Sequence, residues 1–271
     1  MVWIHGGANT RGSGGQNLYG PQYFADYGDI VLVTINYRLG AFGFLSLETT
    51  KAAGNLALKD QHLALQWVQR HIAAFGGNPA DVTLFGESAG SFAVMHQIVS
   101  PWSAGLFSRA IAQSGAPFST FFGVHPPQRP RRVAEALATR LGCDISADDR
   151  LLACLTAAPV QDLLLAQSSA LCAAKETQQR RDAATICVSA PWLPVVDFYA
   201  ARPFLPERPE VLVSQGRHNA VPVLLGVNSE EGIYSAAKYI LQPQRFEELN
   251  AEWDTYGPLY IFNTDEPTRQ V

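Results

Sequence analysis

The pentapeptide Gly86-Glu87-Ser88-Ala89-Gly90 has the pattern G-x-S-x-G, which can supply a nucleophilic serine. In this pattern the serine lies on a sharp turn between a strand and a helix, so its hydroxyl projects clear of the backbone. The N–H of Ala89 could then donate to an oxyanion, because the start of a helix favours negative charge. The alternative is structural: the two glycines only make a tight turn and Ser88 only caps a helix.

A second glycine-rich stretch lies near the start of the chain. Apolar residues 2–4 predict a strand, and His5-Gly6-Gly7-Ala8 follows it directly. Such a loop can point backbone N–H groups at an anion, and hydrolases with a serine turn take part of the oxyanion hole from a loop of this kind. The alternative is a flexible loop. We expect His5 to make a structural hydrogen bond rather than to act as a base.

Carboxylates downstream of Ser88 are candidates for the acid of a catalytic triad. The acid is expected just beyond a strand end, and residues 221–227 predict such a strand. Glu231, in the segment that follows this strand, is the preferred candidate. Glu230 and Asp197 are the alternatives. Any of the three could instead be a helix-capping or surface charge.

The elements that must hold these residues alternate between strands and helices. Strands are expected at 2–4, 29–37, 82–85, 109–114, 194–197 and 221–227, and the continuous apolar runs among them favour a buried parallel sheet. Helices are expected at 55–75, 91–99, 131–141, 149–157, 160–167 and 233–241. The first of these carries an apolar stripe of Ala64, Val68, Ile72 and Phe75. Ser88 would lie at the carboxyl edge of this sheet, where ligands bind, and the helices between 131 and 167 would form an insertion that shapes a pocket.

Composition indicates an ordinary globular chain. It has 271 residues, of which 47% are hydrophobic, and a net charge of −4. The sequence shows no basic stripe for nucleic acid and no membrane span. No signal peptide is visible, and we expect one partial domain over residues 1–271.

Four cysteines, at positions 143, 154, 172 and 187, allow three pairings. Cys143 and Cys154 are close enough in sequence for a disulfide to join them. An oxidising compartment would favour that bond, but buried free thiols in a cytosolic protein fit the spacing equally well.

Several motifs together resemble the type-B carboxylesterases, a group that includes the cholinesterases and has the α/β-hydrolase fold. The resemblance implies a mostly parallel central sheet with flanking helices and a helical insertion, and it runs from residue 2 to about residue 239. The motifs that carry it, in chain order, are Val2-Trp3-Ile4-His5-Gly6-Gly7, Asn36-Tyr37-Arg38-Leu39-Gly40, Gly86-Glu87-Ser88-Ala89-Gly90, Ala112-Gln113-Ser114-Gly115-Ala116, and Gly226-Val227-Asn228 with Glu231-Gly232.

The resemblance assigns roles to individual residues. It makes Ser88 the nucleophile and Glu231 the triad acid, and the oxyanion donors, with Gly6 shaping their loop, are Gly7, Ala8 and Ala89. Ala8 replaces a third glycine of the cholinesterases. The substrate implied is a small-molecule ester, with no cofactor and no metal.

The resemblance also matches Cys143 and Cys154 to a disulfide typical of secreted animal members. It therefore implies a secreted or extracellular protein. It is silent on Cys172 and Cys187.

The catalytic histidine of the family lies well beyond the acid, whereas all six histidines here precede Glu231. We therefore expect residues 1–271 to be the central part of a longer esterase, truncated at both ends, without efficient ester hydrolysis of its own. His125 and His218, which follow Ser88, are the remaining candidates for the base. A non-catalytic adhesion protein on the same scaffold is the alternative function, and the presence of Ser88 and Glu231 favours the enzyme.

Overall fold

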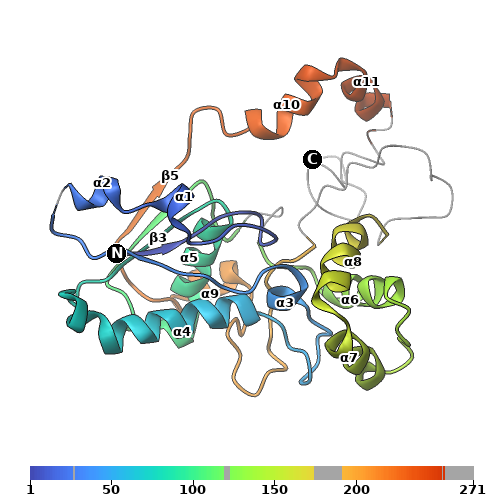
Figure 1. Ribbon diagram of the computed structural model, residues 1–271, viewed down its shortest axis with the longest axis horizontal. Coiled ribbons are helices and arrows are strands. Elements are labelled where there is room, and N and C mark those ends of the chain that lie inside the picture. Colours follow the sequence, from blue (N-terminus) through green and yellow to red (C-terminus); the bar gives the residue numbers. More distant parts are fainter. Residues whose placement is uncertain (27, 119–122, 174–190, 252, 254–271) are drawn as a thin grey trace.

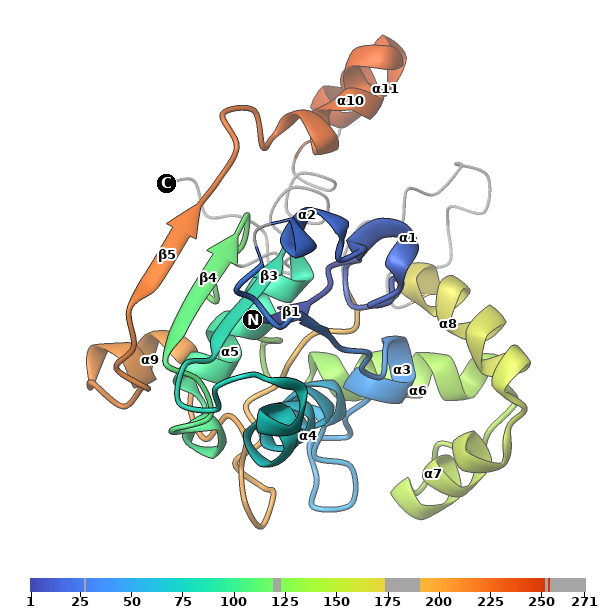
Figure 2. The same cartoon turned by 60° about the vertical axis from the view of Figure 1, so that its left-hand side comes forward.

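A parallel sheet forms the centre of the computed structural model, which describes residues 1–26, 28–118, 123–173, 191–251 and 253 (Figure 1). Its five strands lie in the order β2-β1-β3-β4-β5, and every neighbouring pair is parallel. Their carboxyl ends therefore meet at one edge of the sheet (Figure 2). The strands are β1 (Val2–Ile4), β2 (Val33–Thr34), β3 (Thr83–Glu87), β4 (Arg109–Gln113) and β5 (Val223–Gly226). The expected α/β architecture is confirmed.

Two long helices cover one face of the sheet. They are α4 (Leu56–His71), extended by a 3-10 turn at Ile72–Phe75, and α5 (Ala89–Val99). Val2, Ile4 and Leu84 share one buried cluster with residues of both helices. Trp3 and Phe85 alternate with them along the strands and point to the opposite face. There Trp3 contacts Tyr19 of α1 (Gln16–Tyr19), and Phe85 contacts Phe24 of α2 (Gln22–Ala25).

The buried side of α4 differs from the stripe expected from the sequence. Val68 and Ile72 are buried as expected, but Phe75 is 62% exposed. The buried side instead includes Gln61, whose Oε1 accepts a hydrogen bond of 3.2 Å from Gln97 of α5. A polar residue therefore lies on the buried face of α4, and apolar spacing alone did not locate this face.

Two expected strands are wrong in whole or in part. Of residues 29–37, only Val33–Thr34 forms a strand. Residues 194–197 form none. The N–H and C=O of Val195 bond instead to the side-chain amide of Asn55, at 2.9 and 2.7 Å. This amide takes the place of a neighbouring strand.

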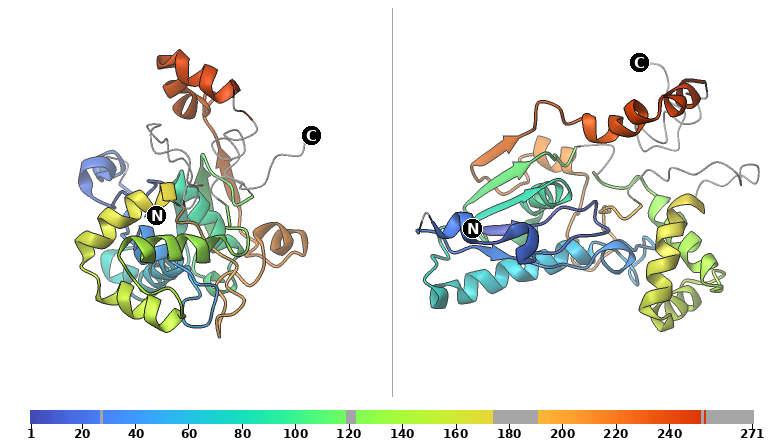
Figure 3. Two further views of the ribbon diagram at one scale, coloured as in Figure 1. Left: turned by 90° about the vertical axis from the view of Figure 1, so that its right-hand side faces the viewer. Right: turned by 45° about the horizontal axis from the view of Figure 1, so that its top comes forward.

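Short helices between the main elements lay outside the expectations from sequence. They are α1, α2, α3 (Gly40–Phe44) and α9 (Pro209–Ser214). Near the C-terminal end, α10 (Ile233–Leu241), which was expected, is followed by α11 (Pro243–Ala251), and both project away from the sheet (Figures 1 and 3). No helix in the described ranges is long and apolar enough to cross a membrane.

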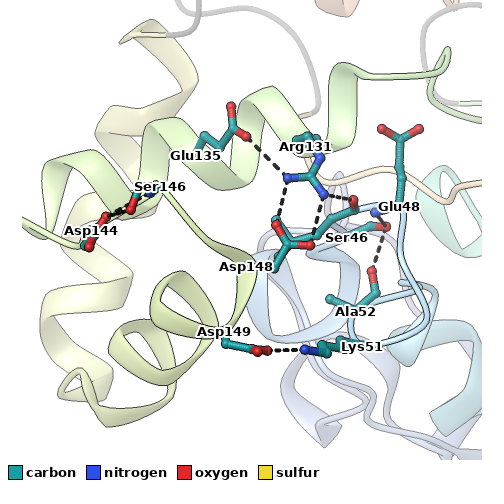
Figure 4. Close-up of polar contacts among 11 residues, drawn as sticks. Ser46, Glu48, Lys51, Ala52, Arg131, Glu135, Asp144, Ser146, Asp148 and Asp149 are labelled. Carbon is teal, nitrogen blue, oxygen red and sulfur yellow. Dashed lines mark hydrogen bonds and ion pairs between the residues drawn. The ribbon is translucent and has the colours of Figure 1, made fainter.

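The helical insertion between β4 and β5 consists of α6 (Arg129–Arg140), α7 (Asp148–Ala157) and α8 (Val160–Ala173). Ion pairs and hydrogen bonds join it to the loop at 46–52 (Figure 4). The Arg131 guanidinium binds both carboxylate oxygens of Asp148, at 2.9 and 3.2 Å, and donates to the Leu47 carbonyl at 2.8 Å. Lys51 pairs with Asp149 at 2.5 Å. Charged groups thus help to join the insertion to the loop at 46–52.

A disulfide joins Cys143 and Cys154, with their Cα atoms 5.8 Å apart. It links the segment that follows α6 to α7, and the expected pairing is confirmed. Cys172 lies in α8, but its side chain is not among those described, and Cys187 lies outside the described residues.

Breaking this disulfide should destabilise the insertion. In the loop-entropy view, a closed loop of this size contributes roughly 3 kcal/mol to the free energy of unfolding. We expect Cys143→Ser and the double serine variant to lose about that amount in urea titration. Peptide mapping of the purified protein without reduction should recover the two cysteines as one linked pair, and two free thiols would contradict the assignment.

Candidate active site

The nucleophile candidate Ser88 lies on a strained turn between β3 and α5. Its backbone has φ 53° and ψ −123°, a conformation that an L-residue adopts only when its surroundings impose it. A Cβ on Gly90 would lie 2.0 Å from the Ile4 carbonyl oxygen, and one on Gly86 would lie 2.6 Å from the Gly90 carbonyl carbon. Both glycines are therefore needed for the strand and helix to come this close, as the pentapeptide predicted.

The Ser88 hydroxyl is not used to hold the helix. Although Ser88 occupies the N-cap position of α5, its side chain makes no capping hydrogen bond. The backbone N–H of Ser88 donates to the Gln113 carbonyl at 2.9 Å, which fixes the turn against the end of β4. The capping alternative is therefore wrong, and the hydroxyl is available for chemistry.

The loop that follows β1 lies directly against this serine. A Cβ on Gly6 would come within 3.2 Å of the Ser88 Cβ and 2.8 Å of the Glu87 carbonyl oxygen. The Gly6 carbonyl accepts from His5 Nδ1 at 2.7 Å, and the Gly7 carbonyl accepts from the N–H groups of Thr10 and Arg11, both at 3.1 Å.

These bonds set the direction of two backbone donors. In a trans peptide the N–H points away from the C=O, so the N–H groups of Gly7 and Ala8 point opposite to the bonded carbonyls of Gly6 and Gly7. Within the described part of the chain, neither N–H has a hydrogen-bond partner. The N–H of Ala89, the first residue of α5, likewise has no partner among the residues that the structure describes. The arrangement can offer several donors to one anion beside Ser88.

His5 supports this loop instead of acting as a base. It is buried, its ring stacks on Tyr37 with centroids 4.5 Å apart, and the Tyr37 hydroxyl donates to its carbonyl at 2.6 Å. Burial lowers the pKa of His5, so the ring is neutral and Nδ1 can donate to Gly6. This is the structural hydrogen bond expected from the sequence.

Glu231 lies just beyond β5, held by two donors. One of its carboxylate oxygens accepts from the Ser114 hydroxyl and, at 2.9 Å, from the Asn228 N–H. These bonds, the Asn228 N–H first, lower the pKa of Glu231, so it is an anion at neutral pH. Ser114 itself donates its N–H to the Gly226 carbonyl at 2.8 Å, which joins the ends of β4 and β5.

Ser114 had no role in the expectations from sequence, although its motif was recognised. It directly follows β4, whose last residue, Gln113, also binds the Ser88 N–H. Ser114 follows β4, the neighbour of the strand β3 that leads to Ser88. This position is the signal that could have identified Ser114. Through Ser114, the Glu231 carboxylate is tied to the same sheet edge as Ser88.

The alternative acids have different surroundings. Asp197 is fully buried and accepts from the N–H groups of Phe204 and Leu205, at 3.1 and 2.7 Å. It also pairs with Lys59 at 3.2 Å, so its carboxylate is committed to structure. Glu230 is exposed, and no described residue bonds to its carboxylate.

Glu87 adds a second carboxylate beside the serine. Burial, and then the negative charge of Glu231, raise the pKa of Glu87. Burial and the charge of Glu87 in turn raise the pKa of Tyr19. Two carboxylates that influence each other's protonation, those of Glu87 and Glu231, therefore lie at this edge of the sheet.

The histidine candidates for the base lie elsewhere. The ring of His125 bonds to the Pro191 carbonyl at 2.8 Å, and burial lowers its pKa to about 3. His218 is exposed in the segment after α9. The hydrogen-bond partners of Glu231 among the described residues are Ser114 and Asn228, and neither is a histidine. The described residues of the chain contain no cluster of three or more metal-ligating side chains.

The comparisons with known proteins all indicate the same family. Residues 1–264 match the model of the carboxylesterase family. The chain is 38% identical over 272 residues to a carboxylic ester hydrolase of Bombus ignitus, covering 100% of this chain and 45% of the relative. It is 41% identical over 237 residues to an acetylcholinesterase of Myxine glutinosa, covering 86% of this chain and 64% of the relative. It is also 36% identical over 272 residues to venom carboxylesterase-6 of Apis mellifera, covering 100% of this chain and 46% of the relative. The chain thus spans about half the length of the first of these relatives.

Proposed function

The chain belongs to the carboxylesterase family, and we propose that the whole protein hydrolyses small carboxylic esters with Ser88 as the nucleophile. The observation that carries this proposal is the strained turn of Ser88 beside a loop with unpaired N–H groups. Among the described residues, the Ser88 hydroxyl makes no capping bond and the N–H groups beside it have no partner, which is the arrangement that acyl transfer requires.

In the proposed reaction, the Ser88 oxygen attacks the ester carbonyl carbon while a histidine takes its proton. The carbonyl oxygen becomes an oxyanion, which the N–H groups of Gly7, Ala8 and Ala89 stabilise. The bond to the alcohol oxygen then breaks, the alcohol leaves with the proton, and the acyl group stays on Ser88. Water repeats the sequence and releases the acid.

Glu231 orients the histidine and stabilises its positive charge. Its lowered pKa supports this role, because an acid of the triad must remain ionised. We further propose that the histidine lies outside residues 1–271, since the order in this fold is serine, acid, histidine, and every histidine here precedes Glu231.

We also propose one domain over the chain and a secreted or extracellular location. Residues of the sheet and of the insertion, such as Val2 and Leu137, belong to one buried cluster, which supports a single domain. The Cys143–Cys154 disulfide supports the location, because such bonds persist in oxidising compartments.

Fluorophosphonate labelling of the whole protein tests the proposed function. We expect one phosphonyl adduct on the peptide that contains Ser88, absent in Ser88→Ala and retained in Ser91→Ala. The absence of an adduct in the folded wild-type protein would refute the proposal and favour the adhesion role.

A further inference from the structure

We propose that Asn9 is a positioning residue for the oxyanion loop, and this proposal rests on the proposed function. The side-chain amide of Asn9 ties the turn that presents the Ala8 N–H to a distant segment of the chain, at Trp192. The argument depends on the geometry of the turn, on its two anchors and on a second asparagine that serves as a control.

The turn itself is conformationally demanding. The Thr10 N–H donates to the Gly7 carbonyl at 3.1 Å, and the two residues between them have φ of 54° (Ala8) and 60° (Asn9). This is a turn of type I′, which needs positive φ at both central positions. Asparagine tolerates that conformation, but alanine does not adopt it readily. Contacts from outside the turn must therefore hold Ala8 in place.

Asn9 provides two such contacts. Its side-chain Nδ2 donates to the Trp192 carbonyl at 2.9 Å, and its own carbonyl accepts from the Gly40 N–H at 2.7 Å. Asn9 is 6% exposed and Trp192 is 1% exposed, so the amide bond is shielded from water. Without the amide, the Trp192 carbonyl would lose its partner in a buried place, and the turn would lose one of its two anchors.

Loss of the Asn9 amide should raise the free energy of the transition state more than it weakens substrate binding. Ala8 precedes Asn9 directly, so a rotation of the turn moves the Ala8 N–H away from the place where the oxyanion develops. Oxyanion donors act mainly on the charge that forms during the reaction, and their displacement lowers kcat while KM changes little.

Asn55 offers a matched control. It too is buried and left-handed, with φ of 59°, and its side-chain Nδ2 donates to the Val195 carbonyl at 2.7 Å. It thus clamps the same segment as Asn9, three residues further along. It lies at the start of α4, outside the oxyanion loop.

The experiment compares Asn9→Gly with Asn55→Gly in the whole protein, with p-nitrophenyl acetate as substrate. Glycine keeps positive φ without strain, so each variant removes only the clamp. We expect kcat of Asn9→Gly to fall by about 10- to 100-fold with KM within about twofold. Asn55→Gly should lower the melting temperature but leave kcat within about twofold. Asn9→Asp, which keeps the shape but loses the donor, serves if the glycine variant does not fold.

Hydrogen exchange gives a second measurement that needs no activity. The backbone amides of Thr10, Arg11 and Gly40, which donate to the carbonyls of Gly7 and Asn9, should exchange faster in Asn9→Gly than in wild type, and at an unchanged rate in Asn55→Gly. Unchanged exchange in Asn9→Gly, unchanged kcat, or an equal loss of kcat in Asn55→Gly would overturn the role of Asn9. Wild-type protein without Ser88-dependent turnover would instead refute the proposed function, and the exchange rates would still decide on Asn9.

Discussion

Ser88→Ala should lower the kcat of the whole protein for p-nitrophenyl acetate by roughly 10⁶-fold, the loss typical of removing a serine nucleophile. What remains would be the rate supplied by binding and the oxyanion donors. The variant should fold normally, because the Ser88 side chain makes no capping bond that alanine would lose. Its melting temperature is therefore expected to match or exceed that of the wild type.

The control for this change is Ser91→Ala, three residues further along. Ser91 is buried, and its hydroxyl donates to the Gly115 carbonyl at 2.8 Å. Its loss should cost about 1 kcal/mol of stability and leave turnover near the wild-type value. A Ser88→Ala protein that still hydrolyses the ester at the wild-type rate would remove Ser88 from the mechanism.

The parts of the site that the sequence predicted are those fixed by local constraints. The turn at Ser88 needs glycine at positions 86 and 90, since a Cβ at either would collide with neighbouring backbone. The five residues 86–90 are therefore enough to predict this turn. The parallel strands β1, β3 and β4 are likewise short apolar runs that local composition identifies.

The parts that the sequence did not reveal depend on contacts between distant segments. The Asn9 amide reaches a carbonyl 183 residues away, and the Asn55 amide reaches one 140 residues away. Neither bond leaves a local pattern, because any asparagine could make it. The same is true of Ser114 and Glu231, which are 117 residues apart and meet only because β4 and β5 are neighbours. Residues 194–196 have the apolar character of a strand, but Val195 bonds to the distant Asn55 side chain instead of to a neighbouring strand.

Glu231→Gln is expected to lower kcat of the whole protein by roughly 10⁴-fold, as the loss of the triad acid does in other serine hydrolases. Glutamine keeps the size of the side chain and can still accept from Ser114 and Asn228, so the structure should change little. It cannot balance the positive charge that forms on the histidine. The reduction should therefore appear in kcat for ester hydrolysis, with KM nearly unchanged.

Two further variants distinguish Glu231 from the other two candidates for the triad acid. Glu230→Gln changes the adjacent exposed carboxylate, whose loss should leave kcat at the wild-type value. Asp197→Asn removes the charge of the buried carboxylate that pairs with Lys59, and its main effect should be a lower melting temperature. A large loss of kcat in Glu230→Gln with little loss in Glu231→Gln would move the triad acid by one residue. If only Asp197→Asn lost activity while keeping its stability, the acid would lie in the 191–205 segment, and the bonds that hold Glu231 would be purely structural.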